Sequence, residues 1–210
     1  MEEAMSRFKS SVAVAFALGL TCSATVAQVT SKADQTVTVV EYYNAALDHY
    51  FMTSLSSEIA ICDIGQPPCV GWVRTGESFQ TWAPGTINTS SNPGVLKVCR
   101  LFNDNYAGTS THFYALTDYH VPGFDCNDTL TEFPDWQLET DELFDANAFL
   151  DPSFGTCAPT YIQLYRLYNN GAGGAPNHRF TSNTMVVQQT YAKGWTFEGA
   201  VMCIPNIPGN

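Results

Sequence analysis

Residues 164–169 of the chain read LYRLYN, and this stretch opens the pattern that predicts the fold. It is short and rich in aromatic residues, which is typical of a β-strand. The asparagine at its end and the glycine-rich residues 170–176 predict a turn. Residues 177–181, which read NHRFT, then predict a second strand that pairs with the first.

A short helix and a third strand complete this unit. Residues 184–193 predict the helix, and Gly194 is the kind of residue that ends one. A strand is expected after Trp195, so that the unit has the order β-β-α-β. Earlier in the chain, residues 53–60 (TSLSSEIA) predict the matching helix, because a capping Ser or Thr is followed by glutamate.

The same unit occurs three times in the sequence. Residues 40–44 (VEYYN) and 99–103 (CRLFN) align with residues 165–169 (YRLYN). Each is followed by a histidine with aromatic neighbours and then by a tryptophan. One such unit cannot bury its own apolar face, so several must pack together. The aligned residues are His49, His112 and His178, and then Trp72, Trp136 and Trp195.

These repeats predict a mainly β protein with short helices, of the α+β class. We expect a single compact domain over residues 37–206, in which three β-β-α-β repeats surround a pseudo-threefold axis. The repeats span about 37–85, 96–151 and 161–206. No long Pro/Gly/Ser linker separates them, and residues 84–93 are expected to form a surface loop.

The composition excludes two classes of partner. Nine Lys and Arg stand against twenty Asp and Glu in 210 residues, which gives a formal net charge of −11. A nucleic-acid binder needs clustered positive charge, and so does a protein that docks on anionic lipid through basic residues. The sequence therefore predicts no nucleic-acid partner and no such membrane contact.

The N-terminus has the pattern of a secretory signal peptide over residues 1–27. Two basic residues, Arg7 and Lys9, precede an apolar run at residues 12–20, and small residues follow up to Ala27. The run is shorter than the roughly 20 residues that cross a bilayer. We expect cleavage after about Ala27, no membrane span, and a mature protein that is secreted or periplasmic.

The six cysteines that remain after cleavage predict disulfides, because an even number in an exported chain is typical of them. Six cysteines allow fifteen pairings, and the sequence does not select one. The pairs that we favour are Cys62–Cys69, Cys99–Cys126 and Cys157–Cys203. Zinc is the alternative, but the chain has no CxxC pair to support it.

The three motifs resemble an uncharacterised repeat domain of secreted bacterial proteins, a domain of unknown function. Its hallmarks are Tyr-Arg-Leu-Tyr-Asn, His-Phe-Tyr-Thr and Gly-Trp-x-x-Glu-Gly, and the resemblance covers nearly all of the expected mature chain. Members of this family occur alone or attached to exported hydrolases, including cell-wall enzymes. The resemblance therefore implies a surface or carbohydrate-binding accessory role.

The first two repeats depart from this pattern at three positions. Glu41 replaces an arginine, Thr75 replaces a glutamate, and Asp135 replaces the glycine before the tryptophan. In the second and third repeats we expect the arginine and the glutamate to form a structural ion pair. The alternative is that the arginines hold an acidic sugar or a carboxylate ligand. The residues concerned are Arg100 and Arg166, with Glu139 and Glu198.

The aligned histidines and tryptophans each allow a structural and a functional interpretation. Three histidines could bind Zn²⁺ if they met near the axis, but we favour structural histidines bonded to Glu139, Glu198 or a carbonyl. The aligned tryptophans could stack on sugars, but we favour a place in the core. Unrepeated aromatic residues are then the better ligand contacts, and we name Trp82, Tyr106 and Tyr119.

No catalytic signature stands out in the sequence. There is no Gly-x-Ser-x-Gly, no His-Glu-x-x-His and no phosphate-binding loop. We therefore expect an exported, non-catalytic module that binds a glycan or cell-wall polymer and needs no metal or other cofactor. The alternatives are a secreted hydrolase that acts on such a polymer, since two carboxylates suffice for that reaction, and a protein-interaction module.

Overall fold

A computed structural model describes residues 35–87, 94–106, 109–117, 126–132, 134–147, 156–208 and 210. The signal peptide expected at residues 1–27 and the ligand contact expected at Tyr119 lie outside them. The described residues belong to one compact unit. None of their helices is long and apolar enough to cross a membrane.

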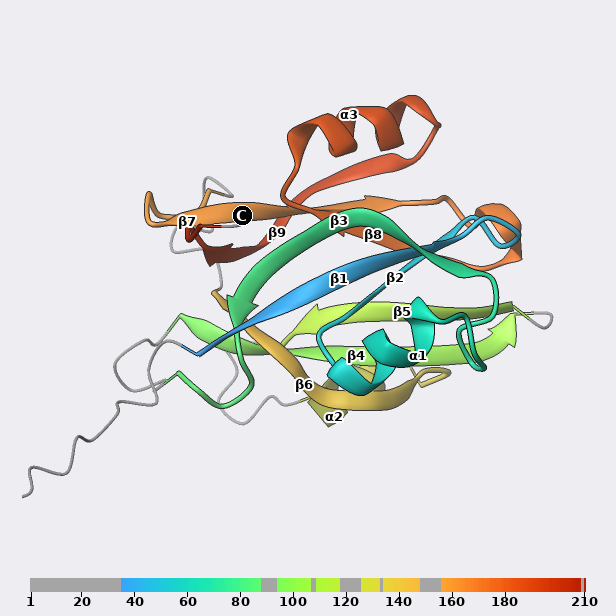
Figure 1. Ribbon diagram of the computed structural model, residues 1–210, viewed down its shortest axis with the longest axis horizontal. Coiled ribbons are helices and arrows are strands. Elements are labelled where there is room, and N and C mark those ends of the chain that lie inside the picture. The colour runs from blue at the N-terminus through green and yellow to red at the C-terminus, as the bar shows by residue number, and fades with distance from the viewer. Residues whose placement is uncertain are drawn as a thin grey trace, which may run out of the picture. The chain divides into compact units, whose positions relative to one another are not determined.

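The chain passes three times through the order strand, strand, helix, strand (Figure 1). We call these parts the first, second and third segments. The first contains β1 (Thr36–Asn44), β2 (His49–Thr53), α1 (Ser56–Asp63) and β3 (Trp72–Trp82). The second contains β4 (Val95–Tyr106), β5 (Thr109–Leu116), α2 (Cys126–Glu132) and β6 (Gln137–Asn147). The third contains β7 (Tyr161–Tyr168), the 3-10 turn η1 (Ala172–Gly174), β8 (His178–Thr181), α3 (Thr184–Ala192) and β9 (Thr196–Pro205).

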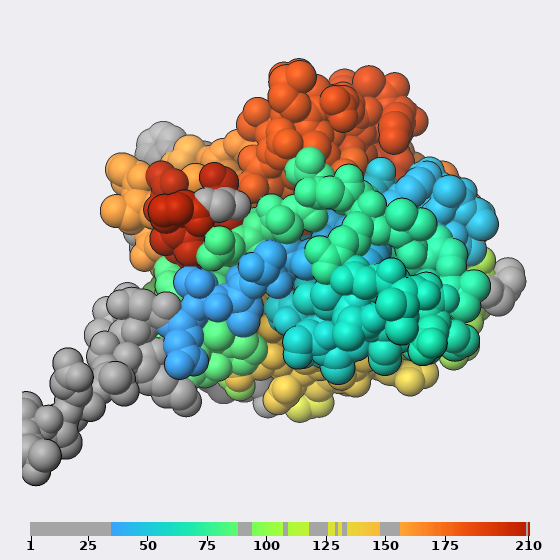
Figure 2. Space-filling model, in the orientation of Figure 1, coloured from blue at the N-terminus to red at the C-terminus, as the bar shows by residue number. Residues whose placement is uncertain are grey.

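All strand pairs are antiparallel, and the expected mainly β class with short helices is confirmed. In each segment the first strand pairs with both of the others. The segments join where Trp82 of β3 pairs with Asp145 of β6, and where Asn147 of β6 pairs with Cys203 of β9. The helices lie on the outside of the strands (Figure 1), and the third segment packs along one side of the first (Figure 2).

The pairing of the first and third strands is irregular at one place in every segment. Register shifts flank Glu41 in β1, Arg100 in β4 and Arg166 in β7. In two of the segments a glycine at positive φ lies on the opposite strand, Gly76 at 92° and Gly199 at 94°. Only glycine adopts such a conformation without strain. The chain thus bends where these charged residues lie.

All three segments contribute to one apolar core. Burial of such side chains is the main source of stability in a domain of this size. Because no segment holds the whole cluster, the strands depend on one another for burial. The core residues are Val39, Met52 and Phe79 from the first segment, Val98, Tyr114, Leu143, Phe144 and Ala146 from the second, and Leu164, Phe180, Met202 and Ile204 from the third.

The three disulfides favoured from the sequence are present. Cys62–Cys69 closes the loop after α1, and Cys99–Cys126 ties α2 to β4. Cys157–Cys203 connects the start of the third segment to β9. Each of these bonds lies within one segment, so none of them links two segments.

A buried ion pair joins the first and third segments. Two nitrogens of Arg179 in β8 donate to the two carboxylate oxygens of Glu41 in β1, at 2.9 and 2.8 Å. The guanidinium also donates to Thr190 and lies 4.1 Å from the ring centre of Tyr50. The side chains are 8% and 6% exposed, respectively, so that each charge depends on the other for compensation.

The helix boundaries differ in detail from the prediction. The first helix begins at Ser56 rather than Thr53, and the side chain of Thr53 instead accepts a hydrogen bond from the Leu55 amide before the helix starts. Gly194 follows α3 as expected. Gly71 precedes Trp72 as Gly194 precedes Trp195, and was expected to end the first helix in the same way. It does not end α1, because the disulfide loop separates it from the last helical residue, Asp63.

We expect the substitution Glu41→Gln to lower the free energy of unfolding by about 3–5 kcal/mol, because it leaves a buried guanidinium without its counter-charge. Denaturant unfolding with the disulfides intact measures this loss. The control is Asp63→Asn, which removes one charge from the exposed pair with Arg74 and should change stability much less. Equal losses for the two variants would contradict the role given to the buried pair.

Candidate functional site

A pocket of about 230 Å³ opens where the first segment meets the second. One wall comes from β2, α1 and the start of β3, and the other comes from β4, β5 and β6. We call it the seam pocket. Its side chains combine aromatic rings with acidic groups and an imidazole. The residues that matter below are Phe51, Glu58 and Trp72 on the first wall, and Phe102, His112 and Glu139 on the second.

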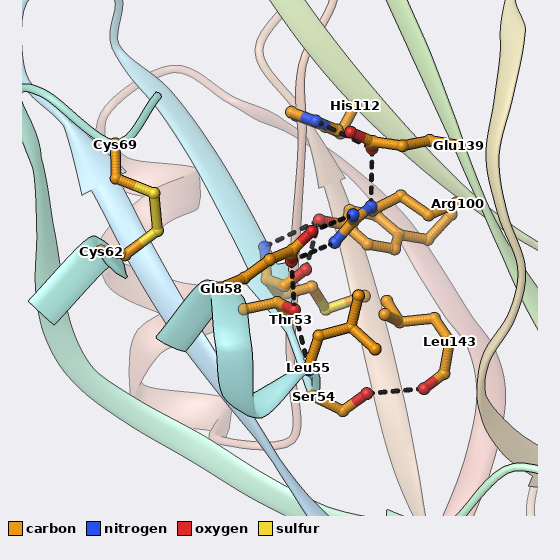
Figure 3. Close-up of polar contacts among 12 residues, drawn as sticks. Thr53, Ser54, Leu55, Glu58, Cys62, Cys69, Arg100, His112, Glu139 and Leu143 are labelled. Atoms are coloured by element: carbon orange, nitrogen blue, oxygen red, sulfur yellow. Dashed lines mark hydrogen bonds and ion pairs between the residues drawn. A yellow bond between two sulfur atoms is a disulfide. The ribbon is translucent and has the colours of Figure 1, made fainter. Parts of the chain in front are cut away.

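Arg100 connects the two walls from beneath the pocket. It lies at the bulge of β4, and its side chain is 1% exposed. Two of its nitrogens donate to the two oxygens of Glu58, at 2.8 and 2.6 Å, and its Nε donates to Glu139 at 2.7 Å (Figure 3). Charge-assisted bonds with two-point geometry are the strong ones in proteins. Both carboxylates are therefore held in fixed positions.

The turn between β2 and α1 places Glu58 in the seam. Thr53, the last residue of β2, donates from its hydroxyl to Glu58 at 2.6 Å (Figure 3). Ser54 donates to the carbonyl of Leu143 in β6 at 2.6 Å. These contacts attach the start of α1 to the second segment, so that its third residue faces Arg100.

Aromatic rings form the apolar side of the seam pocket. The ring centre of Phe51 lies 5.7 Å from Trp72 and 4.8 Å from the imidazole of His112, and Phe102 lies 5.1 Å from that imidazole. The guanidinium of Arg100 lies 5.2 Å from the centre of Phe51. Phe51 is 8% exposed, whereas Trp72 and Phe102 are half-buried, so two rings present surface to a ligand.

The Cys62–Cys69 loop fixes the position of Trp72. Both cysteines are buried in a small cluster against Phe51. The backbone amide of Trp72 donates to the carbonyl of Cys69 at 3.1 Å. Across the base of the loop, Asp63 pairs with Arg74 in the strand that follows. The tryptophan thus starts β3 from a closed loop, which limits how far its ring can move.

The two carboxylates of the seam pocket are ionised at neutral pH. Burial raises the pKa of Glu58, but hydrogen bonds from Arg100 and Thr53 outweigh it, and the pKa falls below its ordinary value of 4.5. Burial likewise raises the pKa of Glu139, and contacts with His112 and Arg100 bring it below that value. Two negative groups and one buried guanidinium thus lie at the pocket.

Neither Trp82 nor Tyr106, which were named as ligand contacts from the sequence, lines the seam pocket. Trp82 ends β3 and packs edge-on against Tyr161, with their ring centres 5.7 Å apart. Tyr106 ends β4, and Tyr119 is outside the described residues. A wider hollow of about 640 Å³ includes Tyr161. It lacks the convergence of rings and buried charge found in the seam pocket.

The aligned histidines do not share one structural position. His112 and His178 lie opposite Phe102 and Tyr168 on the neighbouring strand, whereas His49 lies opposite Asn44. The residue that lies opposite the matching Tyr43 is Tyr50, so the alignment of His49 is wrong by one residue. His49 is fully buried, and its Nδ1 lies 3.1 Å from the carbonyl of Ser110.

The ion pairs expected from the sequence are present. Arg100 and Arg166 bond to Glu139 and Glu198 at 2.7 and 2.6 Å. The Nε2 atoms of His112 and His178 lie 3.2 and 3.5 Å from the same two carboxylates. Among the described residues, no three His, Cys, Asp or Glu side chains form a group that could hold a metal ion.

The expected core role of the tryptophans applies to only one of them. Trp195 is 4% exposed and packs against Tyr50 and Leu167. Trp72 and Trp136 are half-buried, because each lies at a seam between segments. The sequence marked Glu58 only as part of a helix start and gave no sign that it reaches Arg100. That contact spans 42 residues, and no local pattern encodes it.

The fold and the seam pocket define a disulfide-bonded antiparallel β domain whose site is aromatic and acidic. The chain matches the family described as a domain of unknown function (DUF5648) over residues 38–205, and it belongs to that family. This confirms the resemblance to an uncharacterised domain. No curated protein and no solved structure matches the chain.

The lowered pKa values predict how stability depends on acid. A carboxyl whose pKa is lower in the folded state than in the unfolded state stabilises the fold above the unfolded pKa, and this contribution is lost as the pH falls through the folded pKa. We expect the free energy of unfolding to fall between about pH 5 and pH 3, and Glu58→Gln to reduce that slope. Denaturant unfolding at several pH values measures it, and parallel curves for the two proteins would contradict the assignment.

Proposed function

We propose that this protein is an exported, non-catalytic module that binds a glycan or cell-wall polymer in the seam pocket. The observation that carries the proposal is the meeting of half-buried aromatic rings and ionised carboxylates in one small pocket. Sugars present an apolar face of C–H groups and a rim of hydroxyls. A ring such as Trp72 suits the former, and Glu58 and Glu139 can accept hydrogen bonds from the latter.

The dimensions of the pocket support a short contact with a longer polymer. Pockets that enclose drug-sized ligands usually have volumes above about 300 Å³. The seam pocket, at about 230 Å³, is smaller and suits a single sugar ring. A polymer would then extend across the surface on either side, and affinity would come from repeated contacts along it.

A secreted hydrolase is the second candidate, because two carboxylates lie at the same pocket. Glycoside hydrolysis requires one protonated carboxyl as the acid and one ionised carboxylate. Arg100 bonds to both Glu58 and Glu139, and both pKa values lie below the ordinary value. The electrostatics of the pocket therefore favour binding over hydrolysis.

Export and a repeated architecture are part of the proposal. Three disulfides and the expected signal peptide support a secreted or periplasmic location. The recurring order of elements, and the bulge at Glu41, Arg100 and Arg166, support three related units around a pseudo-threefold axis. In such an arrangement, equivalent surfaces meet at each seam between units, and a ligand site can form there.

We expect the oxidised mature protein, residues 28–210, to be retained on at least one of insoluble peptidoglycan, chitin and cellulose without releasing sugar. Trp72→Ala should lower the apparent affinity by at least about tenfold, since burial of a large apolar side chain contributes about 1.5–3 kcal/mol. Sedimentation with the polymer and an assay of reducing sugar in the supernatant measure both outcomes.

The matched control is Trp82→Ala, which removes the same side chain from a site outside the seam pocket and should leave retention unchanged. Release of sugar by the wild-type protein would favour the hydrolase. Absence of both retention and release would refute the glycan proposal and favour a protein partner.

A further inference from the structure

We propose a second ligand site of the same chemical class where the second segment meets the third. It consists of Phe113 and Trp136 on one side and Tyr168, His178 and Glu198 on the other, with Arg166 beneath. We call it the second seam site. This inference rests on the proposed function of the seam pocket, and it makes the protein bivalent for its polymer.

The pairs of Arg100 with Glu139 and of Arg166 with Glu198 have matching geometry. Arg166 lies at the bulge of β7, as Arg100 does at the bulge of β4. Its Nε donates to Glu198 at 2.6 Å, and its guanidinium lies 5.4 Å from the ring centre of Phe113. The corresponding distances around Arg100 are 2.7 Å to Glu139 and 5.2 Å to Phe51.

The rings of the two sites match as well. The imidazole of His178 lies 5.0 Å from Phe113 and 4.9 Å from Tyr168, against 4.8 and 5.1 Å for the rings around His112. Trp136 lies 6.1 Å from Phe113, as Trp72 lies 5.7 Å from its own phenylalanine. Six side chains of the seam pocket thus have counterparts of similar type and spacing at the second seam site.

The arginine of the second seam site is more open to water than that of the seam pocket. The side chain of Arg166 is 25% exposed, whereas that of Arg100 is 1% exposed. Phe113, Trp136 and Tyr168 are all half-buried, so that their rings have surface available to a ligand. Burial, followed by the nearby charge of Arg166, lowers the pKa of His178 to about 3. Its imidazole is therefore neutral and donates or accepts hydrogen bonds without charge.

The third seam, where the third segment meets the first, has the same strand positions, but its side chains are buried. Glu41 lies at the bulge where the other segments have arginine, and Arg179 occupies the strand position of Phe51 and Phe113. Their ion pair fills the seam. Tyr50 and Trp195 are 6% and 4% exposed, so these rings offer almost no surface. Among the described residues, the tryptophan ring is thus half-buried at two seams and buried at the third.

Two sites on one rigid domain bind a polymer with avidity, because the second contact forms at a high effective concentration. The test uses the polymer that retains the wild-type protein, chosen from insoluble peptidoglycan, chitin and cellulose. On that polymer, Trp136→Ala and Trp72→Ala should each weaken the apparent affinity by about 10- to 100-fold, because the lost contact of one large ring carries through to the bivalent affinity. The double variant should lose retention. Binding isotherms from sedimentation give these values.

Two further variants separate ring stacking from folding. Trp136→Tyr keeps an aromatic ring at the seam and should retain most of the affinity that Trp136→Ala loses. Trp82→Ala is again the control outside both sites. Near-UV circular dichroism identifies any variant that has lost its fold, and for such a variant Glu198→Gln takes its place, with a weakening of affinity expected.

The outcomes distinguish the inference from the proposal on which it rests. If Trp72→Ala abolishes retention while the variants at Trp136 and Glu198 bind as the wild type does, the second seam site is refuted and the seam pocket stands. If the wild-type protein is not retained on any of the three polymers, the proposed function fails and the second site fails with it.

Discussion

The architecture depends on guanidinium groups that are buried between segments of the chain. Arg179 pairs with Glu41 across one seam, and Arg100 pairs with Glu58 across another. A buried charge is costly unless an opposite charge and hydrogen bonds compensate it. Because each partner comes from a different segment, a shift between segments would separate the charges. The apolar core favours collapse in general, whereas these pairs specify one arrangement.

The same requirement produces the candidate site. Arg100 bonds to two carboxylates, and these are held at the edge of a pocket that aromatic side chains also line. The polar groups are therefore oriented before a ligand arrives, which reduces the entropy lost on binding. At the third seam, Glu41 takes the place of the arginine and Arg179 takes the place of the phenylalanine, and their ion pair gives a sealed contact instead. A few residue differences at this seam thus replace a surface that could contact a ligand with a buried ion pair.

Some features of the fold were predictable because they depend on near neighbours in the sequence. Aromatic stretches, turn residues and helix starts indicated the order of the elements, and the short loop favoured Cys62–Cys69. The other two disulfides span 27 and 46 residues, and no local pattern selects them. The pairs of Arg100 and Arg166 with glutamate were predictable because the motif brings both residues to adjoining strands. The alignment of His49 failed, since the turn before β2 differs in length and shifts the strand by one residue. Trp82 and Tyr106, named as ligand contacts because they are not repeated, lie outside the seam pocket, and their contact with a ligand stays a prediction.

The sequence by itself determined the chemistry that is available: a strongly acidic, aromatic-rich chain with six paired cysteines and a recurring strand, strand, helix, strand order. These properties follow from composition and from local backbone preferences. Only the tertiary structure decided which groups meet. Glu58 reaches Arg100, and Trp72 remains half-exposed while Trp195 is buried. Each of these outcomes depends on how segments far apart in the chain pack against one another, which no local pattern encodes.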